Sequence, residues 1–268
     1  KWAGGKQHLL KQYDPLFPAV TGRYIEPFIG SGAVYFYLWK KQKLSGEVYL
    51  FDNNEELVNA YLMVKNNIEP LIDELLTHKA HHSKTHYYKV RELDRQNTDL
   101  DDIQRAARTI YLNKTCYNGL YRVNSKRQFN VPIGRYKNPQ IVDPDALRAA
   151  STSLQQACIE KRDFRSITDL ARAGDFFYFD PPYDPLSKTS SFTSYTENNF
   201  NEKDQRDLAE VFAILTRKNC ECMLSNSYTP LILDLYKTYR IEIVHASRAI
   251  NAVASGRRRI NEVVVLNY

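Results

Sequence analysis

The 268-residue sequence has few cysteines and no long apolar run, and both shortages exclude whole classes of protein. The four cysteines, Cys116, Cys158, Cys220 and Cys222, include no CxxC pair, so we expect neither a disulfide scaffold nor a zinc module. No apolar stretch approaches the ~20 residues that a membrane helix needs, which excludes an integral membrane protein. The sequence also lacks a signal peptide, which favours a reducing cytoplasmic interior over secretion, and it lacks an initial Met, which indicates missing N-terminal residues.

Acidic residues are absent from one stretch, residues 103–142. The whole chain has a formal net charge of +6, and this stretch alone exceeds that value, so the remainder is slightly acidic. A solvated face is the usual meaning of a basic run, but Tyr and Asn residues are interleaved at 117–122, and rings with cations suit a nucleic acid better than solvent. The basic residues of the stretch are Arg105, Arg108, Lys114, Arg122, Lys126, Arg127, Arg135 and Lys137.

Short apolar segments that end in turns alternate with helical patterns along most of the chain. This alternation predicts an α/β fold whose mainly parallel sheet is covered on both faces, and the last two strands are expected to form an antiparallel pair. The fifth strand is expected to end at Ser225-Asn226-Ser227. Helices are predicted at 33–38, 57–66 and 201–216, and Asn54 is a good N-cap residue for the second of them. Strands are predicted at 23–27, 48–51, 158–161, 176–179, 222–224, 241–245 and 262–266.

The alternation is interrupted between Pro70 and Arg148. Long polar helical stretches are followed there by a turn-rich piece, Tyr121–Pro139, with Ser125-Lys126 between short extended runs. We interpret this region as an inserted helical subdomain that ends in a basic hairpin. The sequence therefore predicts two domains, one formed by 1–55 with 145–268 and the other by 56–144.

The first motif that carries chemistry is Glu26-Pro27-Phe28-Ile29-Gly30-Ser31-Gly32, between a strand and a helix. Its glycines let a ligand approach the backbone and the helix N-terminus closely. The spacing is neither GxGxxG nor GxxxxGK[ST], which disfavours a dinucleotide and excludes a P-loop. Asp52, at the end of the next strand, is suited to accept hydrogen bonds from ribose hydroxyls. A plain tight turn with a surface Asp is the alternative for these two features.

The second motif, Asp180-Pro181-Pro182-Tyr183, follows the apolar strand 176–179. The prolines fix the backbone and lack N–H donors, so their carbonyls remain as rigid acceptors. With the Asp carboxylate and the Tyr ring they suit an exocyclic amine on a planar ring, through hydrogen bonds and stacking. A proline turn that only ends a strand is the less specific alternative. The Ser-, Thr- and Asn-rich segment Ser187–Asn199 comes next and is expected to be a mobile loop over the bound ligand.

These motifs, in their order along the chain, resemble the S-adenosylmethionine-dependent adenine-N6 DNA methyltransferases of the alpha group, the D12 class. The similarity spans nearly the whole chain and is weakest at Pro70–Gln104 and at Ser225–Tyr228. It implies a Rossmann-like methyltransferase sheet of seven strands with an inserted helical target-recognition domain. The general likeness rests on Lys1–Lys6, Pro27–Gly32 and Asp180–Tyr183, and a closer likeness to the Dam-type enzymes, which modify adenine in GATC, rests on Cys116–Arg122, Phe129–Lys137 and Phe192–Tyr195.

The resemblance implies S-adenosyl-L-methionine as methyl donor, S-adenosyl-L-homocysteine as product and no metal. Asp52 would bind the ribose hydroxyls, while Asp163 and Phe164 would hold the cofactor's adenine by its amine and its ring. Asp180 would contact both the methionine ammonium and the target amine. The residues implied in the cofactor site are Trp2, Gly5, Lys6, Phe28, Gly30, Ser31, Gly32, Asp52, Asp163, Phe164 and Asp180.

The implied chemistry is methyl transfer to a flipped adenine. The N6 lone pair is delocalised into the ring, and acceptors at Asp180 and the Pro181 carbonyl would pull on the two N–H bonds and localise it. Pro182 would keep the turn rigid, and Tyr183 would stack on the base. The transfer is an in-line displacement that gains mainly from positioning. Flipping the base out of a duplex costs a few kcal/mol.

The resemblance places the DNA contacts mainly in the basic segment. Tyr117, beside Asn118, is a candidate wedge that fills the gap left by the flipped base. Leu120, Arg122 and Pro132 match positions that read base edges. Lys1 matches a residue that contacts the first guanine. Phosphate contacts are expected from Lys126, Arg127, Arg135, Lys137 and the loop Arg257-Arg258-Arg259.

We therefore expect a monomeric, DNA-associated enzyme of a bacterium or phage-infected cell that methylates adenine in GATC of double-stranded DNA and has no membrane partner. One alternative is an amine methyltransferase acting on RNA or protein glutamine, against which the basic insertion argues. The other is a DNA-binding relative without catalysis, against which intact Asp180–Tyr183, Trp2 and Asp52 argue. Whether the enzyme belongs to a restriction-modification pair or acts alone stays open.

Overall fold

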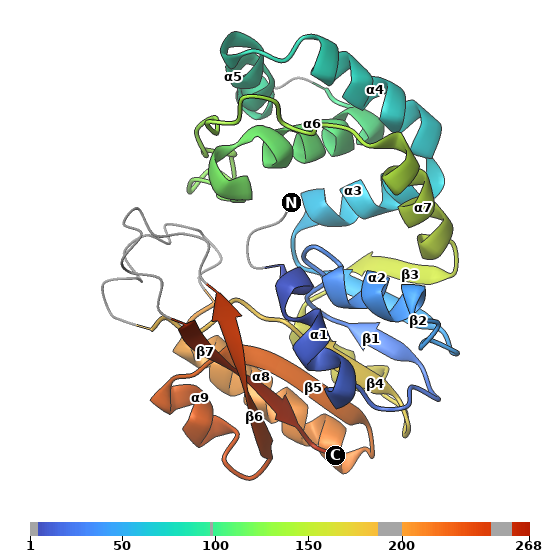
Figure 1. Cartoon of the computed structure of the whole chain (residues 1–268), viewed down its shortest axis with the longest axis vertical. Coiled ribbons are helices and arrows are strands. Elements are labelled where there is room, and N and C mark those ends of the chain that lie inside the picture. The colour runs from blue at the N-terminus through green and yellow to red at the C-terminus, as the bar shows by residue number, and fades with distance from the viewer. Residues whose placement is uncertain (1–4, 97–98, 187–199, 248–258) are drawn as a thin grey trace. The chain divides into compact units, whose positions relative to one another are not determined.

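A mixed sheet of seven strands organises the chain. The computed structural model describes residues 5–96, 99–186, 200–247 and 259–268. The strands lie side by side in the order β3-β2-β1-β4-β5-β7-β6 (Figure 1). The expected α/β fold with a seven-stranded sheet is thus confirmed. In chain order the strands are β1 (Tyr24–Glu26), β2 (Val48–Asp52), β3 (Ala157–Lys161), β4 (Phe176–Phe179), β5 (Glu221–Ser227), β6 (Arg240–Ser247) and β7 (Arg259–Leu266).

Neighbouring strands β2, β1, β4 and β5 are parallel, and β7 runs antiparallel between β5 and β6. The predicted antiparallel pair of the last two strands is confirmed. The predicted end of β5 is wrong, because the strand continues through Ser225-Asn226-Ser227. These polar residues are buried in the strand and pair with β7 up to Glu262. The carboxyl ends of β1, β4 and β5 share one edge of the sheet, so the residues that follow them gather there.

The contacts divide the chain into two compact units. We call the first the helical unit; it consists mainly of Asp52–Lys161. We call the second the sheet unit; it combines Lys6–Phe51, Arg162–Ser194 and Phe200–Tyr268. The helical unit therefore contains the whole of the expected insertion, 56–144, together with β3.

The core of the sheet unit is built around β4, whose four residues are all aromatic and fully buried. Alternate side chains of a strand point to opposite faces. Phe177 and Phe179 accordingly pack in a cluster with α8 (Glu202–Arg217) and α9 (Pro230–Leu235). Phe176 and Tyr178 meet aromatic rings from β1 and from α1 (Leu10–Tyr13). Burial of apolar surface on both faces holds the strand rigid where the second motif begins.

Side-chain caps fix the beginnings of the helices that lead to the motifs. Asn54 Oδ1 accepts hydrogen bonds from the backbone N–H groups of Glu56 and Leu57, as its predicted role at the start of α3 (Glu55–Asn66) requires. Asn201 and Asp204 form a capping box at the start of α8. The remaining α-helices are α2 (Ala33–Lys40), α4 (Ile68–Ala80), α5 (Lys84–Glu92), α6 (Asp102–Thr115) and α7 (Pro144–Leu154).

Candidate active site and nucleic-acid interface

The turn after β4 brings residues from distant parts of the chain together. The ammonium of Lys6 forms an ion pair with Asp180, with 2.9 Å between Nζ and Oδ1. The same nitrogen lies 4.2 Å from the centre of the Tyr183 ring. Lys6 is buried, so this charge has little contact with solvent. Three residues of the predicted site, Lys6, Asp180 and Tyr183, therefore meet in one place.

Ser225 is a neighbour of this site that sequence reasoning missed. Its hydroxyl donates to Asp180 Oδ1 at 2.9 Å, and Tyr178 Oη lies 3.1 Å from the same hydroxyl oxygen. When Ser225 donates its single hydrogen to Asp180, its oxygen remains to accept from Tyr178. The signal in the sequence was the polar triplet after Cys222–Leu224, which looked like a turn and is instead a polar end of a buried strand.

The Tyr183 ring is held at its outer end as well. Its hydroxyl donates to Glu262 Oε2 at 2.8 Å. Burial, followed by the neighbouring Tyr13 and Asp180, raises the pKa of Tyr183 well above its usual range. The phenol therefore stays protonated near neutral pH and offers an uncharged ring.

The glycine loop after β1 adopts the backbone conformation that its composition suggests. Gly30 and Gly32 have φ values of 47° and 65°, a region in which side chains are strained. Ile29 donates its N–H to the Phe51 carbonyl at 2.9 Å, which ties the loop to β2. Helix α2 starts directly after Gly32 without a side-chain cap, and Ser31 lies in the loop between the two glycines. A polar group of a ligand is therefore suited to the start of this helix.

An aromatic cluster lies beside the loop. The Phe28 ring lies 5.4 Å from that of Phe164 and 5.8 Å from that of Phe200, measured between ring centres. Phe28 and Phe164 were predicted site residues, and the structure brings them together. Phe200 was missed, because a Phe between a polar segment and a helix carries no distinctive pattern. The Phe28 ring is inclined by 33° to that of Phe164 and by 81° to that of Phe200, so the three form an apolar cluster of tilted rings and not one flat wall.

Asp163 has protein partners of its own. It accepts from the Arg165 backbone N–H at 2.9 Å, and the Arg165 guanidinium also contacts its carboxylate. That guanidinium bridges to Asp204 and Asp207 of α8. The predicted contact of Asp163 with a cofactor amine would share this carboxylate with Arg165, and it stays a prediction.

Two other predicted cofactor residues, Gly5 and Asp52, belong to the helical unit. Asp52 is the last residue of β2 and accepts from the Asn54 N–H at 2.9 Å, which forms the turn into α3. Gly5 is the first described residue and is half-buried. Lys1 and Trp2 lie outside the described residues, as do the segment Ser187–Asn199 and the residues Arg257 and Arg258.

The predicted base-reading residues lie on adjacent backbone segments. Tyr117 donates its N–H to the Pro132 carbonyl at 2.9 Å, and Gly134 donates to the Thr115 carbonyl at 2.8 Å. Asn118 occupies the left-handed region with φ of 57° and turns the chain so that Leu120 follows closely. Tyr117 and Leu120 are exposed by 47% and 36%, so both side chains are accessible, and their roles in DNA binding stay predictions.

The expected hairpin follows this segment. Val123 bridges to Phe129 in antiparallel fashion, and Asn124 closes the turn by accepting from the N–H groups of Lys126 and Gln128. Arg122 donates its Nε–H to Asn130 Oδ1 at 2.7 Å, so its guanidinium is braced against the opposite arm. The four cations expected to contact phosphate, Lys126, Arg127, Arg135 and Lys137, are all exposed.

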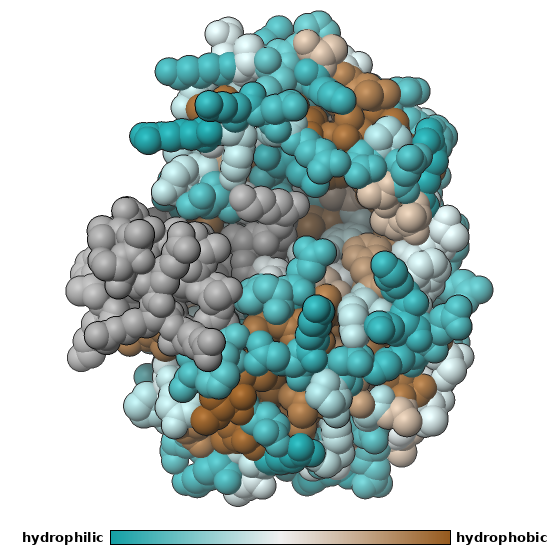
Figure 2. All heavy atoms as spheres, viewed as in Figure 1, coloured by the Kyte–Doolittle hydropathy of each residue, from teal (hydrophilic) through white to brown (hydrophobic). Residues whose placement is uncertain are grey.

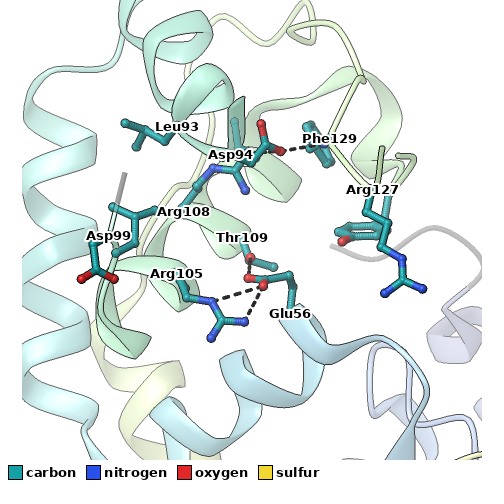
Figure 3. Close-up of a pocket in the computed structure, with 12 residues that line it drawn as sticks. Glu56, Leu93, Asp94, Asp99, Arg105, Arg108, Thr109, Arg127 and Phe129 are labelled. Carbon is teal, nitrogen blue, oxygen red and sulfur yellow. Dashed lines mark hydrogen bonds and ion pairs between the residues drawn. The ribbon is translucent and has the colours of Figure 1, made fainter. Parts of the chain in front are cut away.

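Two residues of the basic run have a different role. Arg105 and Arg108 line a cavity of about 260 Å³ in the helical unit (Figure 3). Arg105 reaches Glu56 at 2.6 Å, and Arg108 reaches Asp94 at 2.7 Å. Their charges are neutralised by these carboxylates, so the sequence count overstates the charge available to a polyanion. Figure 2 shows hydrophilic side chains projecting over α5 and α6 of the same unit.

The described residues provide neither a metal-binding cluster nor a membrane-spanning helix. Within the described ranges, no three His, Cys, Asp or Glu side chains are arranged to hold a metal ion. Among the described helices, none combines the length and apolar character needed to cross a membrane.

Comparisons with known proteins agree with the motifs. The family model of the D12 class N6 adenine-specific DNA methyltransferases matches residues 2–250. The chain is 43% identical to the type II methyltransferase M1.LlaDCHI of Lactococcus lactis, covering 100% of this chain and 94% of the relative. It is 44% identical to the type II methyltransferase M.MjaIII of Methanocaldococcus jannaschii, covering 100% and 98%. It is 32% identical to the DNA adenine methylase of Escherichia coli, covering 99% and 93%.

A comparison with solved structures adds little. The match to TrmN from Thermus thermophilus has a TM-score of 0.38 at 11% identity and covers 98% of this chain and 48% of that one. A likeness at this level carries no argument about fold or function.

Proposed function

Because the chain belongs to the D12 class N6 adenine-specific DNA methyltransferases, we propose that Asp180-Pro181-Pro182-Tyr183 is the place where it methylates adenine N6. The observation that carries this proposal is the meeting of Lys6, Asp180 and Tyr183 at the carboxyl end of β4. A carboxylate beside an uncharged aromatic ring suits an amine attached to a planar base. Family membership favours a DNA enzyme over the RNA, protein and non-catalytic alternatives.

The residues of the sheet unit fit S-adenosylmethionine as the methyl donor. Glu26 provides a carboxylate at the end of β1, and a positively charged ligand is attracted by such a group. The glycine loop leaves room next to the backbone, and the rings of Phe28, Phe164 and Phe200 suit an adenine. When bound, this cofactor supplies a methyl group on a positively charged sulfur. Asp52 is proposed to hold its ribose hydroxyls.

The chain's own residues would activate and hold the target amine. Asp180 accepts one N–H of the amine and the Pro181 carbonyl accepts the other, which localises the lone pair on nitrogen. Asp180 need not be a strong base, because the proton can leave after the methyl group has arrived. The Tyr183 ring stacks on the base and excludes water from one of its faces. Pro182 keeps the turn rigid.

Base flipping and GATC specificity are part of the same proposal. A base inside a duplex must leave the stack before it can reach the turn. Tyr117 is exposed and is proposed to fill the gap that the base leaves. Leu120, Arg122 and Pro132 are proposed to read base edges. Asn130 braces the Arg122 guanidinium, which limits its conformations before DNA binds.

A methyl-transfer assay with tritiated S-adenosylmethionine tests the substrate. Two duplexes are compared, one with a single GATC and the other with the same bases as GTAC. We expect tritium only in the GATC duplex. Equal incorporation in both would remove the proposed specificity, and incorporation in neither, by a protein that binds the cofactor, would overturn the proposed substrate.

A further inference from the structure

The two oxygens of the Asp180 carboxylate differ in their hydrogen-bond partners within the protein. Oδ1 accepts from Lys6 Nζ and from Ser225 Oγ, each at 2.9 Å. In the part of the chain that the structure describes, no donor reaches Oδ2. One oxygen is therefore fixed by the protein, and the other remains to accept a hydrogen from a substrate.

The carbonyls of Pro181 and Pro182 differ in the same way, because only one of them accepts a hydrogen bond from a described residue. Gln205 Nε2 donates to the Pro182 carbonyl at 3.0 Å. No donor among the described residues reaches the Pro181 carbonyl. Gln205 lies in the first turns of α8 and is 1% exposed, so its amide is directed at the turn from inside the protein.

A second layer holds Gln205 in place. Asn226 Nδ2 donates to Gln205 Oε1 at 3.0 Å, and Asn226 Oδ1 accepts from the Asp184 N–H at 3.1 Å. Ser227 Oγ donates to the Asp184 carbonyl at 2.6 Å. The backbone is thus fixed on both sides of Tyr183.

Stability alone does not account for this network. Ser225 and Asn226 are fully buried and lie beside Val264 and Val263 of β7, and burying polar groups is costly unless each is paired. Apolar side chains would fill such positions without that requirement. Each polar group of Ser225 and Gln205 is directed instead at the catalytic turn or its support.

We infer that Ser225 and Gln205 are positioning residues for the methyl-transfer step. Ser225 fixes Oδ1 of Asp180 and Gln205 fixes the Pro182 carbonyl, which leaves Oδ2 and the Pro181 carbonyl as the pair that accepts the two amine hydrogens. The inference rests on the proposed function, in which the target amine binds at this turn. Two fixed acceptors orient the nitrogen lone pair, and orientation is where such a transfer gains most.

Single-turnover methylation of a GATC duplex by Ser225→Ala and Gln205→Met tests this inference. Each substitution removes the donor with little change in volume. We expect the single-turnover rate constant to fall about tenfold to a hundredfold, which is the effect of a small misplacement of reacting groups. The dissociation constants for DNA and for S-adenosylmethionine should stay within about twofold, because neither residue is proposed to touch them. Ser225→Cys, which keeps a weaker donor, should lie between Ser225→Ala and the unchanged protein.

Thr216→Val is the matched control. Thr216 lies on α8 like Gln205, and its hydroxyl bonds Phe212 and Asn267 away from the turn. If Thr216→Val lowers the rate as much as Gln205→Met at equal thermal stability, the effect is structural and the inference fails. Rates within twofold of the unchanged protein for both Ser225→Ala and Gln205→Met would also overturn it. The Asp180→Ala variant distinguishes failure of the proposed function from failure of the inference. Full activity of Asp180→Ala would overturn the proposed function itself. An inactive Asp180→Ala protein together with normal rates for Ser225→Ala and Gln205→Met would overturn only the inference.

Discussion

At the scale of single residues, the proposed active site depends on a few side chains that each contact more than one neighbour. Lys6 neutralises Asp180 and lies over Tyr183, so one buried cation serves both the carboxylate and the ring. A cation above an aromatic face is worth about 2 kcal/mol or more when it is removed from solvent. Tyr183 is held at its other end by Glu262, which restricts the ring to one orientation.

Substitutions of Tyr183 separate the ring from its hydroxyl. We expect Tyr183→Phe to retain most of the transfer rate, because the stacking surface stays and one hydrogen bond to Glu262 is lost. Tyr183→Ala should lower the rate about tenfold to a hundredfold, since stacking on a base is worth about 1–3 kcal/mol. Single-turnover methylation of the same duplex gives both values. A Tyr183→Ala protein that methylates at the full rate would exclude stacking on this ring.

A prediction of the same kind applies to Tyr117. Its side chain is exposed, so Tyr117→Ala should change stability by less than about 0.5 kcal/mol while weakening base flipping. Duplexes with 2-aminopurine at the target adenine report flipping by their fluorescence. A smaller fluorescence rise on binding is expected for the variant, and an unchanged rise would argue against a wedge at this position.

At the scale of elements, the structure shows where sequence patterns were sufficient. The Asn54 cap, the helix over 201–216 and the strand before Asp180 were predictable, because caps and apolar runs act locally. The polar end of β5 was not predictable, because Ser225 and Asn226 owe their burial to hydrogen bonds with residues more than 20 positions away. The ion pairs of Arg105 and Arg108 were not predictable for the same reason, since their partners Glu56 and Asp94 lie in other segments of the chain.

The contact of α4 with α5 and α6 contains a titratable group that predicts a pH dependence. His78 is buried, stacks on Tyr111 and lies 3.1 Å from His86, measured between Nδ1 and Nε2. Burial, together with His86 and His81, lowers the pKa of His78 from 6.5 to about 4. Glu74 faces it from α4, with 4.0 Å between Nε2 and Oε1.

The lowered pKa of His78 determines how the free energy of unfolding changes with pH. Between pH 6.5 and 4 the unfolded chain binds a proton at His78 and the folded protein does not, so the free energy of unfolding falls as the pH is lowered. The loss between pH 7 and pH 5 should be about 2 kcal/mol from this residue. Urea unfolding of the unchanged protein and of His78→Gln at both values measures it. The His78→Gln protein should lose correspondingly less, with His245→Gln as control, and equal losses in all three would contradict the assignment.

At the scale of the whole molecule, the sequence motifs sort into the two compact units. The glycine loop, Asp163, Phe164 and Asp180–Tyr183 belong to the sheet unit, whereas Asp52 and the basic segment belong to the helical unit. The order of the motifs and the family of the protein were predictable from the sequence, because the motifs are short and specific. The strand order was less predictable, since the position of β7 between β5 and β6 depends on pairing between residues more than 30 positions apart.

The most direct test of the central claim identifies the methylated base and the residue that methylates it. A GATC duplex is treated with the unchanged protein or with Asp180→Ala, digested to nucleosides and examined by mass spectrometry. We predict N6-methyldeoxyadenosine from the unchanged protein and at least about a hundredfold less from Asp180→Ala, although that variant still binds DNA. Equal amounts of N6-methyldeoxyadenosine from both proteins, or a methyl group on any other base, would contradict the account.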